Sequence, residues 1–125
     1  MASKKKRKIL VVDDSPTLLK KMELILLRAG YLVATAVNGV DGNKKAYKEN
    51  PDLIVSDIIM PEMDGFHFCR LIKNDGLRQH IPVILLTTLS SGEDKEKGIA
   101  AGADAYIVKD SYDHANLLEI IKRLI

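Results

Sequence analysis

Five short apolar runs, separated by longer segments with helical periodicity, constrain this chain more than any other feature. Runs of four to six largely hydrophobic residues are typical of strands buried in a parallel sheet. The expected strands cover residues 9–12, 32–37, 53–56, 81–86 and 105–108. The expected helices cover residues 16–29, 39–49, 63–73, 91–101 and 113–125. Five strands alternating with five helices predict a doubly wound α/β fold, with a parallel sheet in the order 2-1-3-4-5 and helices on both faces.

The length and composition of the chain are those of one ordinary domain. A chain of 125 residues is long enough to bury a core of its own. No apolar run approaches the ~18 residues that a membrane span requires, and the N-terminus lacks the apolar middle region of a secretion signal. The single cysteine cannot form an internal disulfide. We therefore expect a cytoplasmic domain at residues 9–125, without membrane contact.

Positive charge is concentrated in a basic leader at residues 1–8. The formal net charge of +2 becomes −3 when the five basic residues at 4–8 are left out. A nucleic-acid-binding face requires basic residues spread over a folded surface, so we expect no nucleic acid to be bound by this domain. The leader is interpreted as a solvated segment, with a nuclear-import or polyanion-binding patch as the alternative.

Polar side chains follow four of the five predicted strands. Asp13 and Asp14 follow the first, Asp57 the third, Thr87 the fourth and Lys109 the fifth. Ligands of such sheets bind at the carboxyl ends of the strands, beside the change in strand order, so these residues are expected to converge. Each has a structural explanation when taken alone, but three crowded carboxylates repel one another and require a cation. Oxygen ligands without cysteine or histidine favour Mg²⁺.

Four motifs in this order resemble the receiver domains of bacterial two-component response regulators, of the chemotaxis regulator CheY type. They are VVDDS at residues 11–15, DIIMPEMDG at 57–65, PVILLT at 82–87 and GADAYIVK at 102–109. Each lies at a predicted strand end, and the resemblance covers essentially the whole chain from residue 8. It implies a flavodoxin-like fold and a signalling phosphoacceptor rather than an enzyme, one that assists its own phosphorylation and dephosphorylation.

The resemblance implies a role for each acidic residue. Asp57 accepts a phosphoryl group from the phosphohistidine of a sensor histidine kinase or phosphotransfer protein, or from a small acyl phosphate. Asp14 and Asp57 hold Mg²⁺ directly, Asp13 acts partly through water, and the Ile59 carbonyl is a backbone ligand. An attacking carboxylate needs no general base, only alignment and neutralisation of charge.

The resemblance also implies a switch. Lys109 offsets the charge of the phosphoryl group, and Thr87 donates its hydroxyl to a phosphoryl oxygen. The movement of Thr87 vacates space into which Tyr106 rotates, which alters the surface of the fourth helix, fifth strand and fifth helix. That surface is expected to recognise a downstream effector domain or protein, or a second copy in a phosphorylation-dependent dimer. The alternative is that Tyr106 is only a half-buried strand tyrosine.

Two positions depart from the family pattern. The family commonly has proline, after a cis bond, where Asp110 follows Lys109; we expect a trans bond here and a different loop before the last helix. Ile59 stands two residues after Asp57, where a polar side chain can order an attacking water. We therefore expect a long-lived phosphorylated state.

Three other functions are compatible with parts of this pattern. A phosphatase of the haloacid dehalogenase type needs a second acid at position 59, where this chain has isoleucine. In an FMN carrier, Asp13 and Asp14 would oppose the phosphate, and the chain has no tryptophan for stacking. A receiver-like interaction module that works without phosphorylation stays open. Whether the chain is a free-standing regulator or part of a longer regulator or hybrid kinase also stays open.

Overall fold

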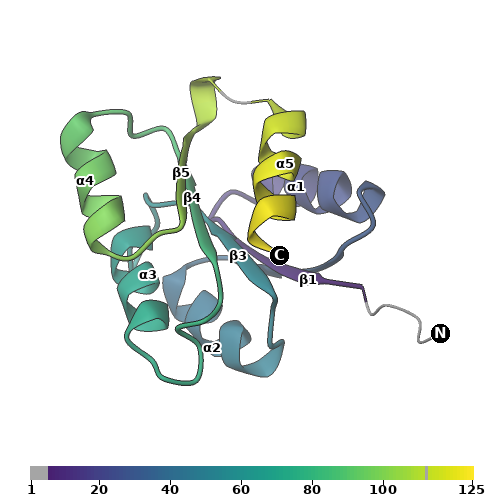
Figure 1. Cartoon of the computed structure of the whole chain (residues 1–125), viewed down its shortest axis with the longest axis horizontal. Helices are drawn as coiled ribbons and strands as arrows, with labels where there is room; N and C mark the ends of the chain where they lie inside the picture. The colour runs from purple at the N-terminus through teal and green to yellow at the C-terminus, as the bar shows by residue number, and fades with distance from the viewer. Residues whose placement is uncertain (1–5, 112) are drawn as a thin grey trace.

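Five parallel strands form the sheet in the order β2-β1-β3-β4-β5 in the computed structural model (Figure 1). The strands are β1 (Lys8–Val12), β2 (Leu32–Ala36), β3 (Leu53–Ser56), β4 (Val83–Thr87) and β5 (Ala105–Val108). The helices are α1 (Pro16–Arg28), α2 (Gly39–Lys48), α3 (Gly65–Lys73), α4 (Gly92–Ala100) and α5 (His114–Leu124), with a 3₁₀ helix η1 (Lys109–Ser111). The predicted alternation and strand order are confirmed.

The structure describes residues 6–111 and 113–125. Residues 1–5 of the predicted basic leader therefore lie outside the described residues, and β1 begins at Lys8. Within the described ranges, no helix combines the length and the apolar character that crossing a bilayer requires.

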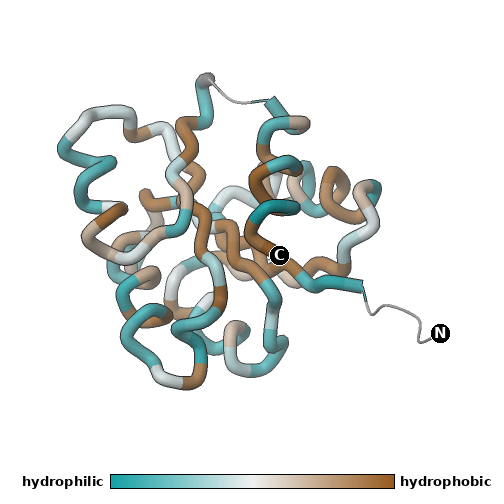
Figure 2. The backbone as a smooth tube through the Cα atoms, viewed as in Figure 1, coloured by the Kyte–Doolittle hydropathy of each residue, from teal (hydrophilic) through white to brown (hydrophobic). Residues whose placement is uncertain are grey.

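Two hydrophobic clusters, one on each face of the sheet, form the core. Leu10 and Val12 of β1 pack into a cluster with residues of α2 and α3, whereas Ile9 and Val11 pack into a cluster with α1 and α5. Figure 2 shows the central strands as hydrophobic and the helices as mixed. Alternating residues of one strand thus enter opposite clusters, which explains why the strands are continuous apolar runs in the sequence.

Most elements begin or end a residue away from the sequence-based prediction, and the larger shifts, at β4 and α3, have local reasons. The strand expected at 81–86 is β4 at Val83–Thr87, because the Ile81 amide donates to the Arg78 carbonyl of the preceding turn and Pro82 has no amide hydrogen. The helix expected at 63–73 begins at Gly65, since the Asp64 side chain caps it. The edge strand β2 stops at Ala36 and is only partly buried.

Arg78 holds the segment between α3 and β4 against α2. The side chain of Arg78 is buried, and its Nε donates to Asp75 Oδ2 at 2.7 Å. Its Nη1 donates to the backbone carbonyl and the side chain of Asn43, at 3.1 and 2.7 Å. The guanidinium lies over the Tyr47 ring, 3.7 Å from its centroid, and the Tyr47 hydroxyl donates to Asp75. The loop is therefore tied to α2 by both charge and stacking.

Asp75→Asn is expected to lower the stability of the protein near neutral pH but to have a smaller effect in acid. The hydrogen bond from Tyr47, followed by that from the Leu77 amide, lowers the pKa of Asp75 from 3.8 to about 2. A carboxyl whose pKa is depressed by folding stabilises the fold fully above its unfolded pKa of about 4, and this contribution is lost as the pH falls toward 2. The difference in urea midpoint between wild type and variant, followed by circular dichroism, should be constant near neutrality and shrink in that acid range.

Glu93→Gln serves as the control for Asp75→Asn. The Glu93 carboxylate is exposed, and its ion pair with Lys97 is 4.0 Å long. Removing it is expected to change the urea midpoint little at any pH. A difference between Asp75→Asn and wild type that stayed constant down to pH 2 would contradict the role assigned to the Asp75 carboxylate.

Candidate functional site

Two acidic residues continue the central strands by one position each. The Asp13 amide donates to the Ala36 carbonyl at 3.1 Å, and the Asp57 amide donates to the Val12 carbonyl at 2.9 Å. The hydrogen-bonded ladder thus extends beyond β1 and β3 and places both residues at the carboxyl edge of the sheet. This edge lies where the strand order reverses, between β1 and β3.

Asp13, Asp14 and Asp57 form an acidic cluster at this edge. Each contributes one carboxylate oxygen to a group whose members all lie within 4.8 Å of one another. Oδ1 of Asp13 accepts from the Ser15 amide at 2.9 Å, and Oδ1 of Asp57 accepts from the Ile58 amide at 2.7 Å. Backbone amides therefore orient two of the three carboxylates.

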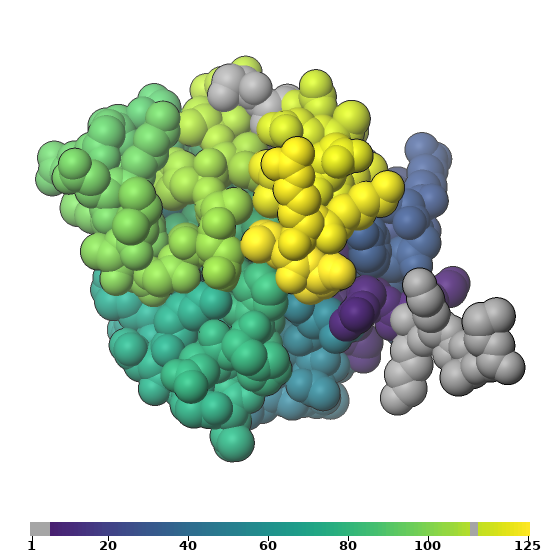
Figure 3. All heavy atoms as spheres, in the orientation of Figure 1, coloured from purple at the N-terminus to yellow at the C-terminus, as the bar shows by residue number. Residues whose placement is uncertain are grey.

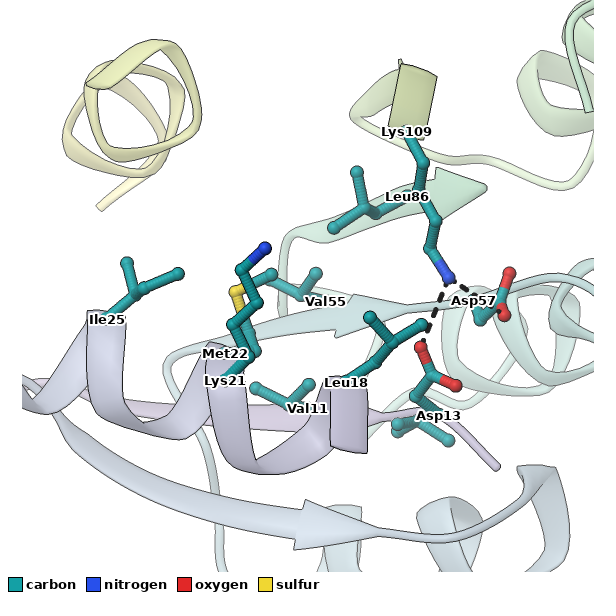
Figure 4. Close-up of a pocket in the computed structure, with 11 residues that line it drawn as sticks. Val11, Asp13, Leu18, Lys21, Met22, Ile25, Val55, Asp57, Leu86 and Lys109 are labelled. Carbon is teal, nitrogen blue, oxygen red and sulfur yellow. Dashed lines mark hydrogen bonds and ion pairs between the residues drawn. The ribbon is translucent and has the colours of Figure 1, made fainter. Parts of the chain in front are cut away.

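Lys109 bridges two members of the acidic cluster. Its ammonium donates to Oδ2 of Asp13 and to Oδ2 of Asp57, at 3.2 Å in each case (Figure 4). Burial lowers the pKa of Lys109, but attraction by Asp57 and then Asp13 outweighs burial, so its pKa is raised above the ordinary value. Lys109 is therefore a cation at neutral pH, and the three carboxylates still exceed its charge.

The donor atoms of the cluster fit a small, hard divalent cation. Carboxylate oxygens are the ligands that Mg²⁺ prefers, and it commonly completes its coordination with water. The excess of negative charge over Lys109 supplies the attraction that a dication needs. The structure thus brings together the three predicted acidic ligands, whereas the role of the Ile59 carbonyl stays a prediction.

Thr87 and Tyr106 are joined through the backbone of one residue, Leu89. The buried Thr87 hydroxyl accepts from the Leu89 amide at 3.4 Å, and the Leu89 carbonyl accepts from the Tyr106 hydroxyl at 2.9 Å. The described hydrogen bonds do not connect Thr87 with the acidic cluster. Thr87 and Tyr106 were expected to be coupled, but Leu89, which links them, was not predicted from the sequence.

Gly98 is a second residue that the sequence analysis missed. A Cβ at this position of α4 would lie 2.7 Å from Cδ2 of the Tyr106 ring. Glycine inside a helix costs roughly 1 kcal/mol relative to alanine, so its presence there was the available signal. The half-buried ring packs against the cluster of α2 and α3, and burial followed by the charge of Asp94 raises the pKa of Tyr106.

The segment after β5 differs from the common family pattern as expected. No cis peptide bond is found in the described ranges, so the bond from Lys109 to Asp110 is trans, as predicted. The chain then forms η1, and α5 begins after Asp113, whose side chain accepts from the Asn116 amide at 2.7 Å. The 3₁₀ helix itself was not predicted.

The fold and the arrangement of acidic and basic groups are those of a response regulator receiver. The family model described as the response regulator receiver domain matches residues 9–122. The chain belongs to this family. Neither the haloacid dehalogenase nor the FMN carrier interpretation is retained.

Similar proteins span transcriptional and chemotaxis regulators. The dual master transcriptional regulator RpaA of Synechocystis is 36% identical over 94% of this chain, which spans 48% of the length of RpaA. The chemotaxis protein CheY4 of Vibrio cholerae is 36% identical with a TM-score of 0.89, covering 97% of this chain and 100% of that one. The response regulator TrrA of Thermotoga maritima, solved in complex with Mg²⁺ and BeF, is 34% identical with a TM-score of 0.84, covering 95% and 99%.

Proposed function

We propose that this domain is a phosphoacceptor, which takes a phosphoryl group onto Asp57 in the presence of Mg²⁺. The donors would be the phosphohistidine of a sensor histidine kinase or phosphotransfer protein, or a small acyl phosphate. The observation that carries the proposal is the Lys109 ammonium, which bridges Asp13 and Asp57 within the acidic cluster. The complex of TrrA with Mg²⁺ and BeF lends support. The domain would span residues 9–125, after a leader at residues 1–8.

The orientation of the Asp57 carboxylate suits direct attack on phosphorus. The Ile58 amide holds Oδ1 at 2.7 Å and Lys109 holds Oδ2 at 3.2 Å. A bond forms between a carboxylate oxygen and phosphorus, while the bond from phosphorus to the donor's leaving group breaks and that group departs with the electron pair. Mg²⁺, held by Asp13, Asp14, Asp57 and the Ile59 carbonyl, would neutralise charge on the phosphoryl oxygens.

Phosphorylation would be transmitted through Leu89. A phosphoryl oxygen would accept a hydrogen bond from the Thr87 hydroxyl and draw it toward the acidic cluster, so that the hydroxyl moves relative to the Leu89 amide that donates to it. Because the Leu89 carbonyl accepts from the Tyr106 hydroxyl, this displacement reaches the Tyr106 ring and the α4 helix behind Gly98. Figure 3 shows α4, the chain around β5 and α5 side by side on one face. We propose this face as the contact for an effector or for a second copy of the domain.

Incubation with acetyl phosphate and Mg²⁺, followed by intact-mass measurement, tests the proposed function. The wild-type protein should gain one phosphoryl group, and chelation of Mg²⁺ with EDTA should prevent the gain. If no adduct forms, and beryllofluoride with Mg²⁺ also leaves the amide NMR spectrum unchanged, the phosphoacceptor function is wrong. The interaction module that works without phosphorylation would then replace it.

Ile59→Asn is expected to shorten the lifetime of the phosphorylated state. The Ile59 side chain is 57% exposed, beside Asp57 but unable to hydrogen-bond a water. An amide at this position could orient water for in-line attack on the acyl phosphate, raising the dephosphorylation rate by about tenfold. The rate is measured from loss of the phosphoryl adduct after removal of acetyl phosphate.

Ile99→Asn provides the matched control for Ile59→Asn. Ile99 is 73% exposed on α4, so the same chemical change is made outside the acidic cluster. Its dephosphorylation rate should equal that of the wild type. Equal rates in Ile59→Asn and the wild type would show that water access at position 59 does not limit the lifetime.

A further inference from the structure

A cavity of about 150 Å³ lies beneath α1, beside the acidic cluster (Figure 4). Its lining from α1 runs from Leu18 to Ile25, two turns of helix or about 10 Å. The floor comes from β1, β3 and β4. The apolar side chains that line the cavity are Val11, Leu18, Met22, Ile25, Val55 and Leu86.

The size and lining of the cavity indicate an apolar ligand about as large as one aromatic ring. An apolar cavity of about 150 Å³ in a protein interior holds benzene. Charged side chains border this cavity on the side of the acidic cluster and at Lys21, and the rest of its lining is apolar. A ring placed against Leu86, Val55 and Met22 would contact the apolar part.

Four charged residues line the cavity, Asp13, Asp57, Lys21 and Lys109, and among them Lys21 alone has no ion pair within the described residues. Lys109 lines the cavity, but its ammonium is already shared between Asp13 and Asp57 at 3.2 Å. Lys21 also lines it, is exposed, and has no ion pair among those of the described residues. Figure 4 shows the Lys21 side chain extending from α1 without turning toward Asp13 or Asp57. Lys21 thus offers an uncompensated cation at the rim of an apolar cavity.

We propose that this cavity binds a small aromatic monocarboxylate, with the ring between α1 and the sheet and the carboxylate on Lys21. Lys109 forms part of the wall, so an occupant holds it in its ion pairs with Asp13 and Asp57. An occupied cavity therefore slows phosphorylation of Asp57. This regulatory effect rests on the proposed function, whereas binding does not.

Benzoate and toluene are the probes, titrated into ¹⁵N-labelled protein with amide NMR shifts as the readout. Benzoate should give saturable shifts in α1 and β4 with a Kd of about a millimolar, as its small number of atoms allows. Toluene, which matches the ring without the charge, should shift the same amides. Absence of saturable benzoate shifts, or binding of toluene alone, overturns the proposal.

Three variants separate the contribution of charge from that of the cavity. Lys21→Met should weaken the binding of benzoate by about fivefold and leave the affinity for toluene unchanged. Lys20→Met is the control, because Lys20 neighbours Lys21 on α1 but pairs with Glu23 at 3.3 Å and does not line the cavity. Ile25→Phe should fill the cavity and abolish the binding of both probes. Benzoate affinity that is unchanged in Lys21→Met or in a folded Ile25→Phe overturns the proposal.

Two further measurements complete the test. Leu18→Phe fills the same cavity from its partly exposed side and replaces Ile25→Phe if that variant fails to fold. Saturating benzoate should slow phosphorylation by acetyl phosphate about threefold in the wild type but not in the filled variant. If benzoate does not alter the rate at which the phosphoryl adduct forms, the regulatory effect is overturned. Absence of any adduct without benzoate overturns the proposed function instead, while the NMR titration still decides binding.

Discussion

Replacing Asp57 with asparagine is expected to abolish phosphoryl transfer to the protein, with a loss in rate on the order of 10³-fold or more. The amide has almost the shape of the carboxylate, and its oxygen can still accept from the Ile58 amide. It is not a nucleophile, however, and it carries no charge for Lys109 or Mg²⁺. The fold should therefore survive while the phosphoryl adduct disappears from the intact mass.

Asp64→Asn is the matched control for Asp57→Asn. Asp64 lies in the same segment between β3 and α3, and its Oδ1 accepts from the His67 amide at 2.8 Å. Asparagine caps helices about as well as aspartate, so this variant should keep both its stability and its phosphoryl adduct. One phosphoryl group on Asp57→Asn would show that another residue is the acceptor, which peptide mapping would identify.

Gly65→Ala is expected to damage both the fold and the proposed phosphoacceptor. A Cβ at Gly65 would lie 2.2 Å from the Asp57 carbonyl oxygen and 2.7 Å from Cα of Ile58. Both atoms belong to the backbone and cannot rotate away, and the Gly65 amide donates to the Ile58 carbonyl at 2.8 Å. The helix start or the segment after β3 must shift. Overpacking of this kind costs about 2 kcal/mol, which should lower Tm by up to about 10 °C.

The shift in Gly65→Ala would also move Asp57 away from Lys109. Phosphorylation by acetyl phosphate should therefore fall by about tenfold even at temperatures where the variant is folded. Gly76→Ala is the control, since a Cβ at Gly76 has no atom within 4 Å. Its stability should change by about 0.5 kcal/mol or less. Wild-type Tm and phosphorylation rate in Gly65→Ala would contradict the close contact at Asp57.

The strand order and the positions of Asp13, Asp57 and Lys109 could be predicted from hydrophobic periodicity together with the rules for connecting parallel strands. Continuous apolar runs indicate strands covered on both faces, and such strands form parallel sheets in which all carboxyl ends share one edge. A polar residue directly after a strand is then placed by its sequence position. Mg²⁺ could be predicted in the same way, since the metal ligands expected at that edge are all oxygen atoms.

Boundaries were less predictable where short-range hydrogen bonds compete with periodicity. Met63 continues the apolar pattern of α3, but the Asp64 side chain caps the helix and delays its start to Gly65. Ile81 continues the apolar pattern of β4, but its amide is taken by Arg78 in the preceding turn. Apolar spacing reports which residues are buried, whereas such hydrogen bonds decide where an element begins.

The fold class, the strand order and the set of polar residues at one edge of the sheet follow from the order of amino acids in the chain. How their side chains meet depends on the packing of segments that are far apart in that order. The Lys109 ammonium bridges residues 96 and 52 positions away, and Leu89 connects Thr87 with Tyr106. The Arg78 contacts with α2 and the cavity beneath α1 arise in the same way. Periodicity specifies the face on which a residue lies, but contacts between distant segments depend on packing and side-chain conformation, which no local pattern encodes.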